Sequence, residues 1–313
     1  MNRFVCIGGM NMDIRGIPFN KIDRSSLFGR VRFEIGGVAF NFAKALIDLG
    51  DQPFLVTVYG SDGLGQGVYN EAIRHGINME FSKEVIGAQT STYLCITDEC
   101  NNDRISLCDR GILHTLKECD LDRILSHFDT EDYYVVDNNL SKQQLSYLLK
   151  QNNDCILLPI SEKSLDEVLE LLPKFKLVQL TRYNIEKTFD LKIYDEDSLH
   201  YAIDFLIGMG IKRCILLLDD LGVVLIEETK YVHFWHERCK SVVNKKTHEL
   251  FLAAYLEMRK DHVPCVNAVE FALGAVLTKT EYANEVAKPL TRSLIIEKIA
   301  EYGIEKVEDK ING

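Results

Sequence analysis

The chain has 313 residues, of which 46% are hydrophobic, with a formal net charge of -11 and a pI near 5.3. That length and composition exclude a disordered chain and allow one large domain or two smaller ones. Lys and Arg are scattered among acidic residues, whereas binding of a nucleic-acid polymer usually requires a basic patch. We therefore expect the partner to be a small molecule or a protein.

Nine cysteines, without any C-x-x-C pair, lie partly inside apolar runs, which predicts reduced thiols in a cytoplasmic protein. No charged leader precedes a long apolar stretch, and no apolar run approaches the ~18 residues that a membrane span needs. We therefore expect no membrane association. The spacing His233-x-x-His236-x-x-Cys239 fits no standard zinc site, so we predict an exposed strand there and no metal.

The N-terminal segment 3–10 is a short apolar strand that ends in two glycines and is followed by Asn11-Met12-Asp13. Polar residues directly after a buried strand commonly lie at the rim of a ligand site in an α/β sheet. Residues 14–35 are turn-prone and then alternate in polarity, which predicts a half-exposed flap strand. From Gly36 a helix is expected to run to Leu49, and glycines before a helix let a ligand approach the backbone.

Strands and helices then alternate along the chain. The hairpin at 91–97 and 104–108 is expected to join the flap in a small sheet. The part after Glu249 is expected to be mostly helical. Strands separated by helices predict a parallel sheet with helices on both faces. The expected strands are Phe54–Tyr59, Tyr133–Asp137, Cys155–Pro159, Leu177–Leu180, Cys214–Leu218 and a pair near 223–234; the expected helices are 66–75, those from Lys142 and from Leu165, and one around 197–209.

The stretch Lys240–Leu256 predicts a strand end at Val242-Val243, a polar turn and a helix. The first N–H groups of a helix have no internal partner, and the helix dipole favours negative charge, so such a turn can hold an anion. Its anion candidates are Lys245, Lys246 and His248. The alternative interpretation is a solvated basic turn.

Several motifs carry a family resemblance. They are V-C-I-G-G-M-N-M-D-I-R-G at 5–16, G-G-V-A-F-N-F-A at 36–43, G-S-D-G-L-G-Q at 60–66, T-S-T-Y-L at 90–94, Cys108-Asp109, V-V-D-N-N-L-S at 135–141 and F-A-L-G-A-V at 271–276 with Glu281-Tyr282. As a set they resemble the ribokinase-like, PfkB-type carbohydrate kinase family, most closely its pseudouridine kinase branch. The resemblance implies one doubly wound, mostly parallel α/β domain over residues 1–313, with a small β lid formed by about 14–35 and 90–108. The lid could also pair with a second copy, as in related kinases, which predicts a homodimer.

The resemblance also implies a sugar or nucleoside site. Carboxylate and amide groups suit it, because each can bind two neighbouring hydroxyls. Without the resemblance, Asp13 reads as a turn residue and Asn41 as a helix cap. The implied substrate-binding residues are Asn11, Asp13, Gly36, Gly37, Asn41 and Asp109.

The phosphate half departs from the family pattern at its catalytic turn. Family members carry D-T-T-G-A-G-D, whose last Asp is the base and whose glycine N–H groups hold phosphate charge. Here Glu249 stands at the Asp, and residues 244–248 contain no glycine. Losing one aligned oxyanion donor typically costs about 100- to 1000-fold in rate. A carboxylate displaced by about 1 Å can cost about 100-fold.

Three further positions depart. Leu158-Pro159 replaces Asp-Pro, and Leu180-Thr181-Arg182 replaces K-P-N, with Asn184 and Glu186 as a shifted remnant. Asp219 replaces a glycine that lines the nucleotide, which puts an anion in front of anions. Together these changes predict that ATP and its magnesium are no longer bound in the usual way.

Three functions are compatible with this pattern. The first is a kinase that uses ATP and Mg²⁺ to phosphorylate a sugar or pseudouridine-like nucleoside, with Glu249 as the base and Lys245 and Lys246 replacing the lost donors. The second is an inactive homologue that needs no cofactor and binds a nucleoside or sugar as a sensor or partner subunit. The third is binding of an already phosphorylated ligand by Lys245, Lys246 and His248.

Overall fold

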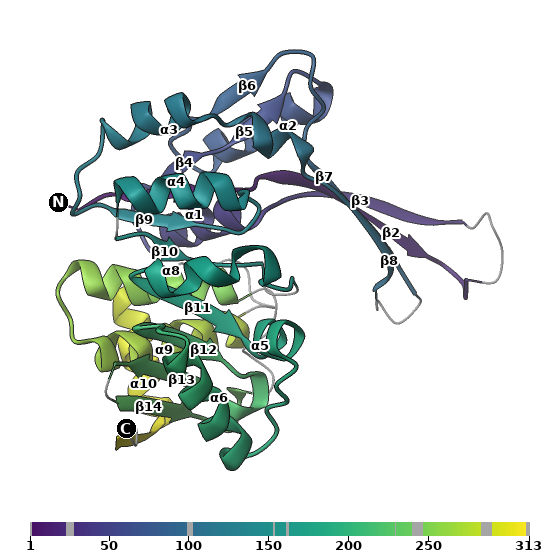
Figure 1. The fold of residues 1–313 in the computed structure, drawn as a ribbon. Coiled ribbons are helices and arrows are strands. Elements are labelled where there is room, and N and C mark those ends of the chain that lie inside the picture. The colour runs from purple at the N-terminus through teal and green to yellow at the C-terminus, as the bar shows by residue number, and fades with distance from the viewer. Residues whose placement is uncertain are drawn as a thin grey trace.

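The computed structural model describes residues 2–22, 28–98, 103–152, 154–160, 163–228, 230–239, 247–282 and 290–310. Within these ranges the main sheet has nine strands in the order β15-β14-β13-β12-β11-β10-β9-β1-β4 (Figure 1). Their bounds are β1 (Phe4–Ile7), β4 (Phe54–Val56), β9 (Tyr133–Val136), β10 (Ile156–Leu157), β11 (Leu177–Thr181), β12 (Arg213–Leu217), β13 (Val223–Glu227), β14 (Lys230–Trp235) and β15 (Glu305–Lys310).

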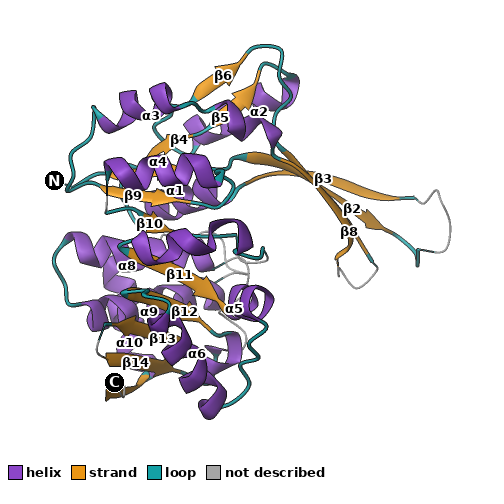
Figure 2. Ribbon diagram, in the orientation of Figure 1, coloured by secondary structure: helices purple, strands orange, loops and turns teal. Residues whose placement is uncertain are grey.

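The expected doubly wound architecture is confirmed. The neighbouring strands β4, β1, β9, β10, β11 and β12 pair in parallel. Strands β13, β14 and β15 continue the sheet in antiparallel fashion. Helices pack on both faces (Figure 2). One core cluster lies under α1 (Val38–Asp48), α2 (Gly63–Arg74), α8 (His248–Lys260) and α9 (Cys265–Glu281), and the other under α3 (Glu118–Leu125), α4 (Lys142–Gln151), α5 (Arg182–Phe189) and α6 (Glu196–Gly208). Because both faces are covered, the central strands are apolar throughout rather than alternating.

The helices include those expected from the sequence apart from the one from Leu165, and two, α3 and α5, that were not expected. They are α1 (Val38–Asp48), α2 (Gly63–Arg74), α3 (Glu118–Leu125), α4 (Lys142–Gln151), α5 (Arg182–Phe189), α6 (Glu196–Gly208), α8 (His248–Lys260), α9 (Cys265–Glu281) and α10 (Arg292–Tyr302), with 3₁₀ helices η1 (Gly111–Thr115), η2 (Asp166–Lys174) and η3 (Asp219–Leu221). Local caps explain several starts. Ser141 and Gln144 form a capping box at α4, and Thr181 and Asn184 form one at α5, so the N–H groups of these four residues are satisfied at the helix starts.

A second, four-stranded sheet has the order β3-β2-β7-β8 and is called the small sheet below. Its strands are β2 (Asn11–Pro18), β3 (Gly29–Gly36), β7 (Thr92–Thr97) and β8 (Asp103–Asp109). It extends away from the main body, on the side where β1 ends (Figure 1). The flap and the hairpin expected from the sequence are therefore neighbours, joined through the parallel pairing of β2 with β7.

Several elements differ from the sequence expectations. The strand expected to be exposed around His233–Cys239 is partly buried, with Phe234 and Cys239 fully buried and β14 paired on both sides. The strand expected over Phe54–Tyr59 splits at Thr57, whose N–H is bonded to the Ser82 hydroxyl at 3.2 Å, and β5 (Val58–Gly60) pairs with β6 (Lys83–Val85) instead. The helix expected from Leu165 is the 3₁₀ helix η2, which contains Pro173 near its end. Strand β15 lies in the part expected to be mostly helical, and its single apolar residue, Val307, is exposed.

Membrane association was not expected from the sequence. In the ranges given above, no helix has both the length and the apolar character required to cross a bilayer.

Candidate active site

A buried carboxylate, Asp137, joins three segments where β1 and β9 end. Its Oδ2 accepts hydrogen bonds from the N–H groups of Gly9 at 2.8 Å and Ala39 at 3.2 Å, and its Oδ1 accepts one from Asn139 at 2.8 Å. Burial raises the pKa of Asp137, and these N–H donors oppose the rise. A Cβ at Gly8 would lie 2.3 Å from Asp137 Oδ2, so the glycine allows this close packing.

Helix α1 begins beside this carboxylate, at Gly37. Gly37 has φ of 105° and no side-chain cap, and a Cβ there would lie 2.3 Å from the Gly9 carbonyl oxygen. The backbone is therefore both left-handed and closely packed, which only glycine tolerates cheaply. Gly36 is restricted in a different way, since its Cβ would meet Asp13 Oδ2 at 2.5 Å. Both glycines are therefore required by close packing within the chain, and their role in binding a ligand stays a prediction.

On the small sheet, Asn11 and Asp13 lie at the start of β2, where the Asn11 side chain donates a hydrogen bond to Asp13. Burial raises the pKa of Asp13 to about 6 and the charge of Glu34 adds to this, while the Asn11 hydrogen bond and the charge of Arg15 oppose it. The Asp13 carboxylate, held by Asn11, is thus a partly buried hydrogen-bond acceptor next to the Gly36 backbone.

Asp109 lies farther along the small sheet. It is exposed and opposite Thr92, which in turn pairs with Met12, so two strand spacings separate Asp109 from β2. Its Oδ1 accepts the Gly111 N–H at 3.1 Å. The structure does not bring Asp109 into contact with the Asn11 and Asp13 pair.

Glu249 lies in the first turn of α8, the helix that packs against α1. Burial raises the pKa of its carboxyl to about 7, and the charge of Asp137 adds to this. Hydrogen bonds from its own backbone N–H and from the Asn41 side chain oppose the rise. Glu249, Asn41 and Asp137 therefore form one cluster at the edge where the parallel strands end. A carboxyl with a pKa near 7 is suited to general base catalysis at neutral pH.

His248 precedes Glu249 and is buried, and neither ring nitrogen has a hydrogen-bond partner among the described residues. Burial lowers the pKa of His248 to about 4, so the ring is neutral at physiological pH and offers an anion a single N–H rather than a charge. Gln179, in the middle of β11, donates to the His248 carbonyl at 2.9 Å and so holds the start of α8 against the sheet. Lys245, Lys246 and Val242-Val243 lie outside the described residues.

A cation, Arg182, lies beside Asp219, the residue expected to repel a nucleotide. Arg182 forms an ion pair with Asp220 at 3.1 Å, and its charge lowers the pKa of Asp219, although burial, the dominant cause, raises that pKa. Asp219 has φ of 51°, in the region that favours glycine. Arg182 Nε is buried without a partner among the described residues, so this guanidinium keeps a free donor.

Asn184, considered above as a remnant of the family's phosphate motif, has a structural role. Its Oδ1 accepts the Thr181 N–H at 3.0 Å, and its Nδ2 donates to the carbonyls of Ile160 at 3.0 Å and Lys163 at 2.9 Å. Its hydrogen-bonding groups are thus used to cap α5 and hold a neighbouring segment. Glu186, the other half of that remnant, accepts the Ile193 N–H at 3.4 Å.

Asp137 is the residue of this cluster that the sequence reasoning left without a role. It belongs to the quoted motif at 135–141 and directly follows the buried strand β9, the same signal that directed attention to Asn11 and Asp13.

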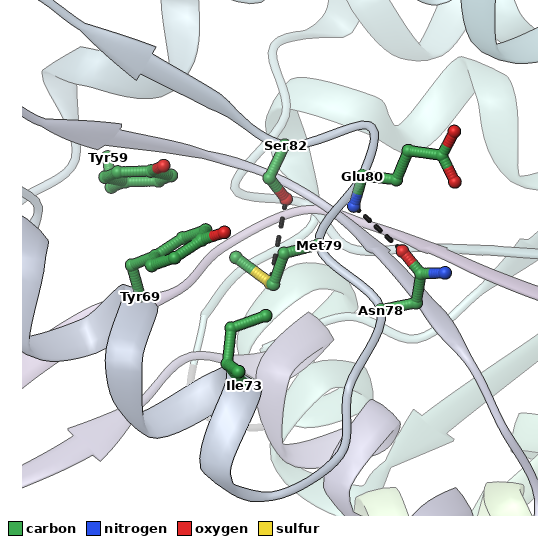
Figure 3. Close-up of a pocket in the computed structure, with 7 residues that line it drawn as sticks. All are labelled: Tyr59, Tyr69, Ile73, Asn78, Met79, Glu80 and Ser82. Carbon is green, nitrogen blue, oxygen red and sulfur yellow. Dashed lines mark hydrogen bonds between the residues drawn. The ribbon is translucent and has the colours of Figure 1, made fainter.

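A cavity elsewhere holds none of the expected site residues. It has a volume of about 500 Å³, and Tyr59 and Tyr69 line it together with Met79 and Glu80 (Figure 3).

Comparison with known proteins gives three consistent findings. Residues 1–245 match the family model described as pfkB family carbohydrate kinase. The pseudouridine kinase of Escherichia coli (strain K12) is 23% identical over 287 residues, which is 90% of this chain and 91% of the relative. The guanosine-inosine kinase of Exiguobacterium acetylicum is 24% identical over 268 residues, with 82% and 87% covered.

Solved structures share the fold. A carbohydrate kinase from Agrobacterium tumefaciens superposes with a TM-score of 0.80 at 16% identity, covering 99% of this chain and all of the other. The ribokinase of Arabidopsis thaliana, solved with ribose and ATP, superposes with a TM-score of 0.77 at 15% identity, covering 96% and 99%. At these identities the likeness shows the ribokinase-like fold alone.

Proposed function

Since the chain belongs to the PfkB family of carbohydrate kinases, we propose that it transfers the γ-phosphoryl group of ATP to a hydroxyl of a nucleoside or sugar. The observation that supports this most is the position of Glu249, a carboxyl with a pKa of about 7 beside Asn41 and Asp137. A nucleoside is favoured as substrate because both relatives named above are nucleoside kinases.

In the proposed reaction, Asp13 and the Gly36-Gly37 backbone bind sugar hydroxyls, and Asn11 holds Asp13 in place. Glu249 accepts the proton of the attacking hydroxyl as its oxygen bonds to the γ-phosphorus. The bond from the γ-phosphorus to the bridging oxygen breaks, and ADP leaves. Mg²⁺, when bound together with ATP, would supply positive charge to the phosphoryl group, and Arg182, which is paired with Asp220 at 3.1 Å, is the described cation proposed to add to it.

A second candidate function is supported by the state of the phosphate half. His248 is neutral, Arg182 is already paired with Asp220, and Asn184 is fully hydrogen-bonded. An inactive homologue would keep nucleoside or sugar binding by Asn11, Asp13 and Asn41 and lose phosphoryl transfer. It would serve as a sensor or a partner subunit.

A coupled assay with Mg²⁺-ATP, pseudouridine and a panel of ribonucleosides and pentoses tests both candidates. ADP release that depends on one of these acceptors supports the kinase. Thermal stabilisation by a nucleoside without turnover, and without stabilisation by Mg²⁺-ATP, supports the inactive homologue, because a ligand that binds the native state raises its stability. If neither turnover nor stabilisation occurs, both proposals are wrong.

The small sheet has an apolar face suited to a second copy of the chain. In one row across the sheet, Phe33 pairs with Ile14, Ile14 with Leu94, and Leu94 with Leu107. Phe33, Leu94 and Leu107 are 61%, 37% and 64% exposed, whereas Ile14 is partly buried against the core, so three of the four side chains are open to solvent in the single chain. Contiguous exposed apolar rows of this kind mark interaction surfaces. We therefore propose a homodimer in which two such faces pack together.

The substitution Leu107→Asp should convert this dimer to a monomer, because an unpaired charge buried in the interface is costly. Ser106→Asp is the matched control, since it adds the same charge to the adjacent residue on the opposite face. Light scattering coupled to size-exclusion chromatography gives the mass directly. A monomeric wild-type chain at micromolar concentration, or a dimeric Leu107→Asp variant, would contradict the proposal.

A further inference from the structure

A cavity of about 730 Å³ lies at the edge of the main sheet where β10, β11 and β12 begin. Its walls come from the end of η2, the connection from α6 to β12, and the ends of β13 and β14 that face each other. The candidate active site lies where β1 and β9 end. Since these strands are parallel, the two sites occupy opposite edges of the same sheet.

The cavity is positively charged in a chain that is strongly acidic overall. Five basic side chains line it against three acidic ones, while the whole chain carries a net charge of -11. The basic residues are Lys174, Lys176, Lys212, Arg213 and Lys230, and the acidic residues are Asp154, Glu227 and Glu228. A concave surface lined mainly by one sign of charge concentrates the field and attracts the opposite ion.

Two of the lysines form no ion-pair contact with a described carboxylate. Lys176 pairs with Asp154 at 2.7 Å, and Lys230 pairs with Glu308 on β15 at 2.6 Å. In the part of the chain that the structure describes, Lys174 and Lys212 form no ion pair, and both are exposed at the cavity. The charge of Lys174 lowers the pKa of the exposed Glu170, but neither ammonium group is held in an ion-pair contact, so both can meet an anion.

Arg213, the third cation, is only loosely held. Its guanidinium lies 3.4 Å from Glu227, which faces it across the β12 and β13 pair and is too distant for a strong hydrogen bond. Its Nε is buried without a partner among the described residues. A guanidinium with unused donors can bind two oxygens of one phosphate group in a forked geometry.

We propose that this cavity binds a small anion carrying two or more phosphate charges, such as a polyphosphate or phosphorylated metabolite. Lys174 and Lys212 supply point charges, and Arg213 supplies directed donors. The site goes beyond the proposed phosphoryl transfer, because it shares no residue with the Glu249 cluster and lies at the other edge of the sheet. An alternative role is that these lysines only complement the carbonyl ends of α4, η2 and α6, which favour cations.

Isothermal titration of the full chain with inorganic pyrophosphate separates the two interpretations. The double variant Lys174→Ser/Lys212→Ser should weaken binding by about tenfold, because two exposed charge interactions are lost. The control Lys83→Ser/Lys279→Ser removes the same charge from exposed ion pairs elsewhere, with Asp120 and Asp48, and should bind as the wild type does. Rising salt should weaken the wild-type affinity, because exposed charges are screened.

Binding that is unchanged in Lys174→Ser/Lys212→Ser, or absent in the wild type at millimolar pyrophosphate, would overturn the proposal and leave the helix-end role. Glu249→Gln separates this site from the active site. That variant should bind pyrophosphate as the wild type does even where it abolishes turnover. Failure of the kinase assay therefore does not affect the result. Thermal unfolding of each variant confirms that the exposed lysines are replaced without loss of the fold.

Discussion

Glu249→Gln should reduce acceptor-dependent ADP formation by about 100- to 10,000-fold, the usual contribution of a general base. Glutamine keeps an oxygen that can accept the Asn41 hydrogen bond but cannot take a proton from the attacking hydroxyl. The measurement is the initial rate with the best acceptor at saturating Mg²⁺-ATP. Glu257→Gln is the control, since it makes the same change on α8, two turns farther on, at a carboxyl whose pKa is also raised to about 7.

The pH profile gives a second readout of the same residue. A base must be ionised to act, and burial raises the pKa of Glu249 to about 7, so the wild-type rate should rise with pH through about 7. Glu257→Gln should keep that profile. A residual rate in Glu249→Gln that still rises through about pH 7, or a rate close to that of the wild type, would show that another group is the base.

The fold of Glu249→Gln should be preserved and slightly more stable at about pH 8. A carboxyl whose pKa is higher in the folded state than in the unfolded state gives up stability as pH rises from its unfolded pKa to its folded pKa. For Glu249 that interval runs from the ordinary glutamate value to about 7. Glutamine removes this penalty, so its unfolding temperature should exceed that of the wild type at about pH 8 and match it only at a pH near or below the ordinary glutamate pKa.

Asp13→Asn should weaken nucleoside or sugar binding by about 10- to 100-fold, because hydrogen bonds to a charged acceptor contribute about 1.5–3 kcal/mol. The change keeps the size of the side chain and its contact with Asn11 but removes the charge that two hydroxyls would share. Isothermal titration with the best acceptor measures it whether or not the chain is an active kinase. In an active enzyme the KM should rise more than kcat falls.

Glu34→Gln is the control for Asp13→Asn. Glu34 lies directly opposite Asp13 in the pairing of β2 with β3, and it is exposed. Its neutralisation removes one negative charge from the same part of the small sheet without removing the proposed acceptor. Equal losses in the two variants would mean that general electrostatics, rather than contact with Asp13, favours the ligand.

The sequence was a good guide wherever local pattern and tertiary contact agree. The small sheet follows from the alternation in β3 and from the turn between β7 and β8, and the glycines before α1 are required by the approach of the Gly9 carbonyl and the Asp13 carboxylate. The split of β4 from β5 could not be predicted, because it depends on the Ser82 hydroxyl, which is distant in sequence from Thr57.

Burial was the main property that the sequence could not supply. His248 was considered as an anion ligand because of its residue type, but burial makes it neutral. Asp219 was expected to place an anion in front of the nucleotide; Arg182, from the start of α5, lies close enough to lower its pKa, while burial, Asp220 and Glu186 raise it. Asn184 matched a motif remnant, yet its hydrogen bonds to Thr181 and Ile160 are structural. Each outcome depends on which segments meet in space.

The hydrogen bonds of Asp137 also constrain how the protein is made. Two of its three N–H donors, Gly9 and Ala39, lie 128 and 98 positions earlier in the chain. Contacts this distant in sequence form only after a large loop has closed, and that closure costs entropy before any contact repays it. A nascent chain on the ribosome therefore cannot form the hydrogen bonds of Asp137 to Gly9 and Ala39 until β9 and Asp137 have emerged. A fragment that stops before residue 137 should lack ligand binding even though it contains Asn11, Asp13, Gly36, Gly37 and Asn41.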